Sequence, residues 1–251
     1  MNLKKLISHV SATAESYPDK IFKDPGKAYT CINPYSYHII RKNPQIYYQM
    51  DGLFIDGMSM CWWIKWLWGV RIPRLSFDMT AIAKDLFGYI NGLSQDKSIF
   101  FIGARQHEVE KSVAQIKSSY PNINDIRYRN GYFQSEKERI AVISEIVKVD
   151  TDYVIVGMGA PLQDKFALDL MKAGYKGIVF TCGGFLHQTS EDINYYPEWV
   201  NNYNLRALYR LFYEKGLVKR LFNVLIEFPI LFIKDTIQTK FINRVNSYEK
   251  L

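Results

Sequence analysis

Four short segments of the sequence carry glycines at positions where a phosphorylated ligand could approach the backbone. They read IDGM (55–58), FIGA (101–104), VGMGAP (156–161) and TCGGF (181–185). Glycine has no Cβ, so its backbone can come close to a phosphate, and the amides at the start of a following helix favour negative charge. The four segments therefore predict a site for a nucleotide or another phosphorylated ligand.

Asp56 is the only carboxylate in these four segments. A general base must lie within hydrogen-bond reach of the hydroxyl it deprotonates, and partly apolar surroundings would raise the pKa of such a carboxylate toward the useful range. Helix capping is the alternative, because Asp is a frequent N-cap residue and a helical pattern follows at 58–68. Position alone gives the two roles equal weight. We interpret the tryptophans of the following run, Trp62, Trp63 and Trp66, as core residues.

Other catalytic patterns do not fit. Gly157 and Gly159 have the spacing of a dinucleotide fingerprint, but Leu162 stands where its third glycine belongs. The DxD sequence at 150–152 precedes a predicted strand, which places it at the opposite end of the sheet from the glycines. The four histidines lack metal-ligand spacing, and no GxSxG follows a predicted strand. We therefore expect no metal ion and no cofactor.

The apolar runs indicate how these residues are positioned. Strands are predicted at 29–32, 53–55, 98–103, 126–129, 152–157 and 177–182, with helical segments near 36–49, 58–68, 79–92, 106–119, 135–148 and 162–173. This alternation predicts an α/β, Rossmann-like fold with a mostly parallel sheet and helices on both faces. Four of the six strands end at a glycine segment, so the predicted site lies at the carboxyl edge of the sheet.

The C-terminal region has a different composition. We predict an α/β catalytic domain over 1–199 and a helical appendage over 200–251, where residues 205–251 hold nine Lys/Arg and four Asp/Glu. That charge favours an anionic partner, of which we expect an anionic membrane surface or a phosphorylated substrate and no nucleic acid. The stretch 221–233 is too short to cross a bilayer. It could lie on lipid or against a second subunit, so a homo-oligomer stays open.

The cysteines and the N-terminus bear on location. Three widely spaced cysteines suggest neither a disulfide framework nor a zinc site. The first residues lack an apolar run of signal-peptide length. We therefore expect a cytoplasmic protein, peripheral at the inner face of the cell membrane.

An ordered set of motifs resembles one enzyme family. The motifs are INPYS (32–36), IDGMSMCWWIKWLWG (55–69), RLSFDM (74–79), FFIGA (100–104), YPNINDIRYRNGYF (120–133), VGMGAPLQD (156–164), CGGF (182–185) and YPEW with LRALYRL (196–211). From about Asn33 to Arg220 the chain is similar to the WecG/TagA/CpsF family of glycosyltransferases.

The resemblance implies an inverting, metal-independent transfer of a sugar from a UDP-sugar to a polyprenyl-diphosphate-linked saccharide, at the cytoplasmic face of a bacterial membrane. The family's base falls on Asp56. The substrate-binding positions it implies are Cys31, Asn33, Arg74, Asp78, Gly103, Tyr132, Gly157, Gly159, Gln163, Gly183 and Gly184. The positions it implies for the acceptor or the membrane are Arg206, Arg210, Lys219 and Arg220.

The chain also departs from the family pattern. The departures are Cys31 for Thr, Leu162 and Asp164 for Lys and Glu, His187 for Asp, Tyr195 for Arg and Arg206 for Glu. They leave the donor sugar and the acceptor glycan open. They also motivate the alternative of a non-catalytic nucleotide-binding or scaffold protein, against which the retention of Asp56 argues.

Overall fold

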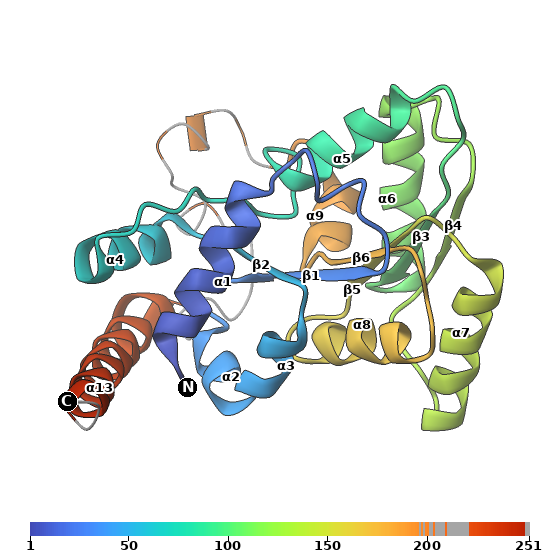
Figure 1. Ribbon diagram of the computed structural model, residues 1–251. Helices are drawn as coiled ribbons and strands as arrows, with labels where there is room; N and C mark the ends of the chain where they lie inside the picture. The colour runs from blue at the N-terminus through green and yellow to red at the C-terminus, as the bar shows by residue number, and fades with distance from the viewer. Residues whose placement is uncertain (196, 198, 201–202, 204–208, 210–220, 249–251) are drawn as a thin grey trace.

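The structure, a computed structural model, describes residues 1–195, 197, 199–200, 203, 209 and 221–248 (Figure 1). Its centre is a six-stranded sheet with the order β2-β1-β6-β5-β3-β4, in which all strand pairs are parallel. The strands are β1 (Lys27–Ile32), β2 (Gly52–Ile55), β3 (Ile99–Gly103), β4 (Ile126–Arg129), β5 (Tyr153–Gly157) and β6 (Ile178–Thr181). The predicted parallel α/β fold and its six strands are confirmed.

Burial explains why these runs form strands. Every residue of β2, β3, β5 and β6 is buried, whereas β4 at the sheet edge is half exposed. Strands covered on both faces read as continuous apolar runs, which is the pattern of IFFI and YVIV. Because all six strands are parallel, their carboxyl ends meet at one edge.

Helices cover both faces of the sheet (Figure 1). One face packs against α1 (Leu3–Glu15), α2 (Tyr37–Lys42), α3 (Pro44–Gln49), α4 (Met58–Trp68), α7 (Glu136–Val149), α8 (Leu162–Lys172) and α13 (Phe228–Tyr248). The other face packs against α5 (Ile82–Asn91), α6 (Gln106–Ser119) and α9 (Phe185–Glu191). Two hydrophobic cores result, one on each side of the sheet.

Local chemistry explains where the helices differ from prediction. The segment predicted at 36–49 is split at Asn43, because the residue before Pro44 is disfavoured in the helical region. Helices α1 and α9 were not among the predicted elements. The other predicted helical segments match α4 to α8 closely.

The C-terminal helix α13 contains Pro229 in its first turn. A wide π-helical turn, η1 (Asn223–Glu227), precedes it, and the Phe228 N–H donates to the Asn223 carbonyl. Phe228 and Phe232 join the core of the sheet face. The division at residue 200 stays a prediction, but α13 packs directly on the body.

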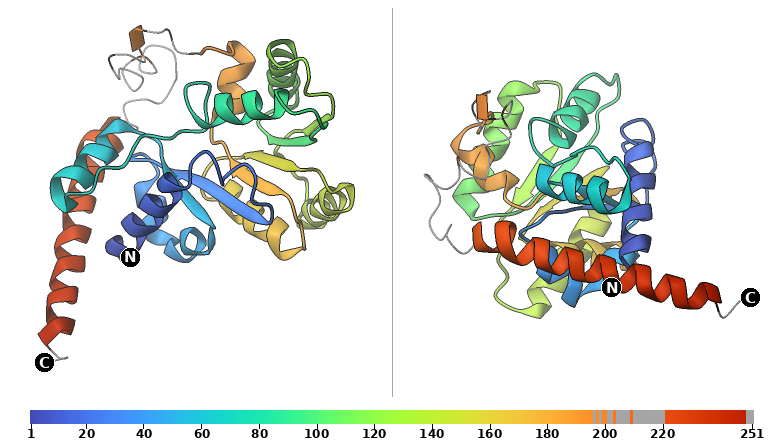
Figure 2. Two further views of the ribbon diagram at one scale, coloured as in Figure 1. Left: turned by 45° about the horizontal axis from the view of Figure 1, so that its top comes forward. Right: turned by 90° about the vertical axis from the view of Figure 1, so that its left-hand side faces the viewer.

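Figure 2 shows α13 running along one side of the molecule and projecting beyond it. Within the described part of the chain, none of the helices combines the length and apolar character that a membrane span requires.

Candidate active site at the carboxyl edge of the sheet

Asp56 lies directly after β2, at the carboxyl edge of the sheet. Its N–H donates to the Ile32 carbonyl at 2.9 Å, so pairing with β1 continues past the strand and puts Asp56 beside Asn33. Gly57 follows with φ of +132°, and a Cβ there would lie 3.0 Å from Cδ of Pro34. Gly57 is also the N-cap of α4, and no described side chain caps that helix. Helix capping, the alternative role for Asp56, is therefore not observed.

A return segment, residues 74–78, lies against this strand end. The Leu75 N–H donates to the Ile55 carbonyl at 2.9 Å, which extends the backbone pairing of β2. The Cys31 thiol donates to the Leu75 carbonyl at 3.9 Å from below. Burial, followed by the charge of Asp56, raises the pKa of the Cys31 thiol, so Cys31 is an uncharged thiol beside the site.

Arg74 connects two carboxylates in this segment. Its Nη2 donates to Asp56 Oδ1 at 3.3 Å, to Asp78 Oδ2 at 2.9 Å and to Ser76 Oγ at 2.6 Å. Its side chain is only 16% exposed. Burial works against the charge of the guanidinium, but Asp56 and Asp78 outweigh it and raise the pKa of Arg74. Arg74 thus stays charged and fixes the orientation of Asp56.

The surroundings of Asp56 differ from the apolar ones we expected. Its side chain is 41% exposed and has a cation on one side, because the return segment brings Arg74 beside it. Oδ1 takes the Arg74 hydrogen bond, whereas Oδ2 accepts none from the described residues. This partly exposed carboxylate therefore has one oxygen with no hydrogen bond from the described residues.

Asn33 shapes the neighbouring loop. Its Oδ1 accepts from the Ser36 N–H at 2.8 Å, which is an Asx-type turn leading into α2. With this turn, the Asn33 side chain is held beside Asp56 at the edge of the sheet.

The glycine segments pack against one another. A Cβ on Gly103 would lie 2.3 Å from the Gly157 carbonyl oxygen, and one on Gly131 would lie 2.9 Å from Cα of Gly103. A Cβ on Gly157 would lie 2.9 Å from Sγ of Cys182. These glycines are thus required by contact between neighbouring loops. Gly159 and Gly183 differ, since both have positive φ and open space where a Cβ would point.

Gln163 joins two of these loops. Its side chain is 4% exposed, and its Oε1 accepts from both the Gly159 and the Gly183 N–H at 3.1 Å. These two amides, which we expected to face a phosphate, therefore have a protein partner. Gln163 holds the ends of β5 and β6 at a fixed separation.

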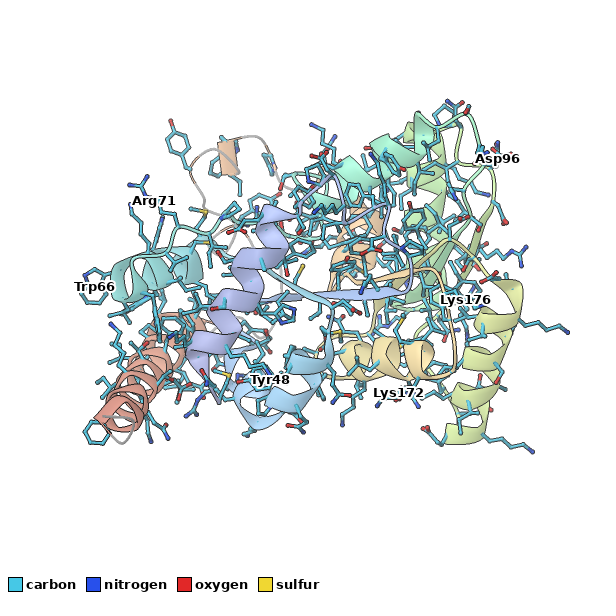
Figure 3. The ribbon with its side chains drawn as sticks, in the orientation of Figure 1. Tyr48, Trp66, Arg71, Asp96, Lys172 and Lys176 are labelled. Atoms are coloured by element: carbon cyan, nitrogen blue, oxygen red, sulfur yellow. The ribbon has the colours of Figure 1, made fainter. Side chains whose placement is uncertain are left out.

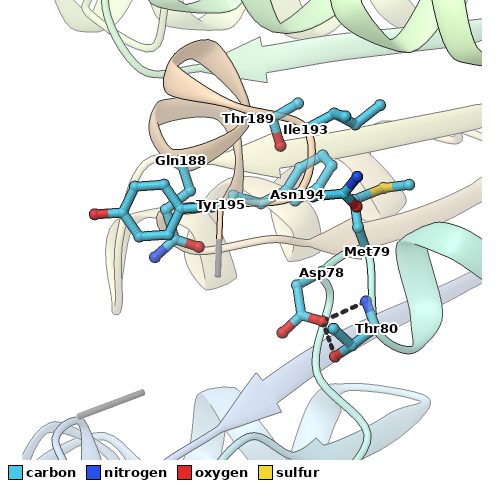
Figure 4. Close-up of a pocket in the computed structure, with 9 residues that line it drawn as sticks. Asp78, Met79, Thr80, Gln188, Thr189, Ile193, Asn194 and Tyr195 are labelled. Carbon is cyan, nitrogen blue, oxygen red and sulfur yellow. Dashed lines mark hydrogen bonds between the residues drawn. The ribbon is translucent and has the colours of Figure 1, made fainter. Parts of the chain in front are cut away.

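A small pocket adjoins the Arg74 network (Figure 4). Asp78, Met79 and Thr80 line one side, and Asp78 Oδ1 accepts from the Thr80 N–H at 2.8 Å. The other side comes from α9 and the residues after it, namely Phe185, Gln188, Thr189, Ile193, Asn194 and Tyr195. Gly184 is the N-cap of α9, so the second glycine pair brings this wall to the site.

Comparisons with known proteins show the family of this chain. The family model described as Glycosyl transferase WecG/TagA/CpsF family matches residues 5–241. This chain belongs to that glycosyltransferase family. A UDP-Gal:alpha-D-GlcNAc-diphosphoundecaprenol beta-1,4-galactosyltransferase of Shigella boydii is 34% identical over 212 residues, 84% of this chain and 88% of that protein.

Two further relatives are N-acetylglucosaminyldiphosphoundecaprenol N-acetyl-beta-D-mannosaminyltransferases. The one from Bacillus subtilis is 31% identical over 57% of this chain and 54% of that protein. The one from Bacillus spizizenii is 24% identical over 51% of this chain and 49% of that protein.

The structure brings most of the positions implied by the WecG/TagA/CpsF resemblance to one edge. Asp56, Asn33, Cys31, Arg74 and Asp78 gather at the ends of β1 and β2, and the glycines with Gln163 lie at the ends of β3, β5 and β6. Tyr132 follows β4 at the far end and is 65% exposed. Arg206, Arg210, Lys219 and Arg220 lie outside the described residues.

The DxD sequence lies where predicted, at the amino end of β5. Asp152 accepts from Lys97 Nζ at 2.7 Å and from Ser98 Oγ at 2.9 Å, so it ties β5 to the start of β3. Within the described residues, no group of three or more His, Cys, Asp or Glu side chains is arranged to hold a metal ion.

Two polar groups near the edge were not predicted. His187 Nδ1 lies 2.8 Å from Glu108 Oε1, which joins α9 to the start of α6. Asp164 is fully buried and accepts from Thr30 Oγ1 at 2.6 Å and from the Tyr47 hydroxyl at 3.1 Å. The sequence feature that could have indicated the Asp164 group is a threonine in each of two mainly apolar strands, Thr30 and Thr181. Their hydroxyl oxygens lie 2.6 Å apart, so both belong to the same buried polar group.

Proposed function

We propose that this protein transfers a hexosyl or N-acetylhexosaminyl group from a UDP-sugar to a saccharide linked to a polyprenyl diphosphate. The proposal rests on family membership and on the diphosphoundecaprenol-linked acceptors named for the relatives. The reaction belongs to the assembly of a bacterial surface polysaccharide. We place the protein at the cytoplasmic side of the membrane, as a peripheral enzyme.

We further propose that the transfer inverts the anomeric carbon. The relatives' names specify β linkages, in one case with UDP-Gal as donor. A single displacement gives a β linkage when the donor sugar is α-linked to its diphosphate. Such a displacement needs one base and no covalent intermediate on the protein.

The observation that carries the mechanism is that the Asp56 side chain is 41% exposed and only its Oδ1 is bound by Arg74, so Oδ2 accepts no hydrogen bond from the described residues. In the proposed step, an acceptor hydroxyl oxygen forms a bond to the anomeric carbon. The bond between that carbon and the diphosphate oxygen breaks, and UDP leaves with the electron pair. Asp56 Oδ2 receives the hydroxyl proton. Asn33, next to Asp56, is proposed to contact the sugar.

The diphosphate needs positive charge if no metal takes part. Gly159 and Gly183 give their N–H groups to Gln163, so their amides do not supply it in the described arrangement. We assign this role to Arg206, Arg210, Lys219 and Arg220, together with the remaining helix N-terminal amides. The same cations could bind the diphosphate of the lipid-linked acceptor.

The test is a transfer assay with a panel of UDP-sugars and short polyprenyl-diphosphate glycans in EDTA. UDP-galactose comes first, because the galactosyltransferase relative matches 84% of this chain. Asp56→Asn should lower the rate by about 10²-fold or more, since a positioned base contributes about 10²–10⁴. Asp19→Asn is the control, because Asp19 is exposed and lies in the linker between α1 and β1.

Three outcomes would contradict the proposal. Equal rates for Asp56→Asn and wild type would remove Asp56 as the base. A strict requirement for added divalent cation would remove metal independence. Binding of UDP without transfer from any donor would favour the non-catalytic alternative.

A further inference from the structure

The tryptophans of α4 do not all belong to the core, contrary to our expectation. Trp63 packs on the hydrophobic core, but Trp62 is 57% exposed and Trp66 is 72% exposed. Figure 3 shows Trp66 directed away from the body at the outer side of α4. The helix is apolar nearly all round, so one side buries Met60, Cys61 and Ile64 while the other presents indole rings to the exterior.

Helix α13 has a similar outer side. Its inner side buries Phe228, Phe232, Thr236 and Thr239 against the body. Its outer side exposes Ile230, Ile237 and Phe241 by 60%, 64% and 68%, and Ile233, Lys234 and Gln238 lie on the same side of the helix. Residues three, four and seven apart share one side of a helix, so the apolar residues form a stripe.

The two helices are joined into one face. Trp68 Nε1 donates to Thr236 Oγ1 at 3.1 Å, and Lys240 Nζ donates to the Leu67 carbonyl at 2.8 Å. The right-hand view of Figure 2 faces this side of the molecule and shows α13 running across it with α4 alongside. We call the outer sides of α4 and α13 the α4–α13 face.

The charge of this face is positive. Lys65 on α4, Arg71 just after it and Lys234 on α13 are exposed. Residues 58–74 contain no Asp or Glu, and the only acid within 228–241 is Asp235, which is 3% exposed and paired with Arg41. Apolar side chains with tryptophans and a basic surround are typical of helices that lie in the interface of an anionic membrane.

We propose that the α4–α13 face rests on a phospholipid bilayer with anionic head groups. The inference extends the proposed function, since an acceptor attached to a polyprenyl chain is held in a bilayer. Helix α4 begins at Met58, two residues after Asp56, so the face adjoins the active-site edge. A second copy of the chain is the less suitable occupant, because a two-fold contact would place this basic face against itself.

Flotation of the full chain with vesicles tests the proposal. Vesicles of phosphatidylcholine with phosphatidylglycerol should bind the protein, and vesicles of phosphatidylcholine alone should bind it less. The double variant Trp62→Ser with Trp66→Ser should bind about tenfold more weakly or worse, because part of two large apolar side chains no longer enters the interface. Ile237→Ser should weaken binding as well. Ile140→Ser is the matched control, since Ile140 on α7 is 55% exposed outside this face.

A charge variant separates the electrostatic part. Lys65→Gln with Arg71→Gln and Lys234→Gln should remove most of the preference for anionic vesicles while retaining the residual binding to neutral ones. Thermal unfolding of all variants should match wild type, since the changed side chains are exposed. A variant that melts early would be replaced by Trp66→Ser alone.

The readouts separate this inference from the proposed function. Unchanged vesicle binding by the tryptophan and isoleucine variants overturns the inference, even if transfer to a short-chain acceptor in detergent proceeds. Loss of vesicle binding in these variants supports it, even if no donor gives transfer. If wild type is a dimer, and these variants are monomers that still bind vesicles as wild type does, the face contacts a second copy and the proposal is overturned.

Discussion

Arg41 on α2 and Asp235 on α13 are joined by two hydrogen bonds, 2.7 Å from Nε and 3.0 Å from Nη2, across 194 positions of sequence. The Tyr37 hydroxyl donates to the same carboxylate at 2.8 Å, and Asp235 is 3% exposed. Helix α2 follows directly on the Asn33 turn. The C-terminal helix is therefore held on the element that leads out of the active site.

Removal of the Asp235 carboxylate should destabilise the protein. Asp235→Ala leaves the Arg41 guanidinium and the Tyr37 hydroxyl without their shared acceptor in a nearly closed site. The free energy of unfolding should fall by about 3 kcal/mol, as measured by urea denaturation. Lys234→Ala, the exposed neighbour on the same helix, should change it by less than about 0.5 kcal/mol. A loss for Asp235→Ala no larger than that of the control would show that the pair contributes nothing net.

The strands could be predicted from sequence because their signal is local. IFFI and YVIV are apolar at every position, and only strands covered on both faces bury such runs completely. The split between α2 and α3 was also local, because it depends on Pro44, but the helical periodicity on each side concealed it.

The site depended on contacts that sequence patterns do not record. Arg74 reaches Asp56 only because the segment after α4 returns to β2, so the ion pair was not foreseen. Gly103 and Gly157 lie at the predicted sheet edge, but the sequence did not reveal that their backbones touch. Contacts between neighbouring loops are enough to require glycine at both positions, without a ligand. The sequence also could not separate the exposed Trp66 from Trp63, which packs on the core. Helical periodicity shows that a residue is apolar but not whether its side of the helix faces the core or the exterior.

The Gln163 bridge predicts a linked effect on stability and on nucleotide binding. Gln163→Leu leaves the Gly159 and Gly183 N–H groups without their acceptor, which should lower the free energy of unfolding by about 2 kcal/mol. UDP affinity, measured by calorimetry, should fall because the two loops lose their fixed separation. Gln49→Leu on the exposed side of α3 is the control. Wild-type UDP affinity in a destabilised Gln163→Leu would restrict Gln163 to a structural role.

Gly103 and Gly88 provide a matched pair of glycine substitutions. Gly103→Ala forces a methyl group to 2.3 Å from the Gly157 carbonyl at a φ of +155°, so the loops must separate. We expect a loss of about 3 kcal/mol or more in stability. Gly88 is exposed within α5 and a Cβ there meets nothing within 4 Å, so Gly88→Ala should add about 0.5–1 kcal/mol. Thermal denaturation of both variants checks the prediction, which fails if Gly103→Ala melts as wild type does.

The buried Asp164 predicts a pH dependence of stability. Burial raises the pKa of this carboxyl above its ordinary value of 3.8, although the hydroxyls of Thr30 and Tyr47 oppose the shift. The folded state then binds the Asp164 proton more tightly than the unfolded chain does. Its contribution to stability is full below pH 3.8 and is lost as the pH rises through that value toward the folded pKa.

Asp164→Asn removes this titration and keeps one partner for each hydroxyl. The variant should therefore gain stability relative to wild type as the pH rises from 4 to 7. Urea denaturation at several pH values measures the difference, with Asp19→Asn as an exposed control whose difference should stay flat. A difference for Asp164→Asn that is constant with pH, or that falls as the pH rises, would show that the carboxyl does not titrate at a raised pKa in the folded protein.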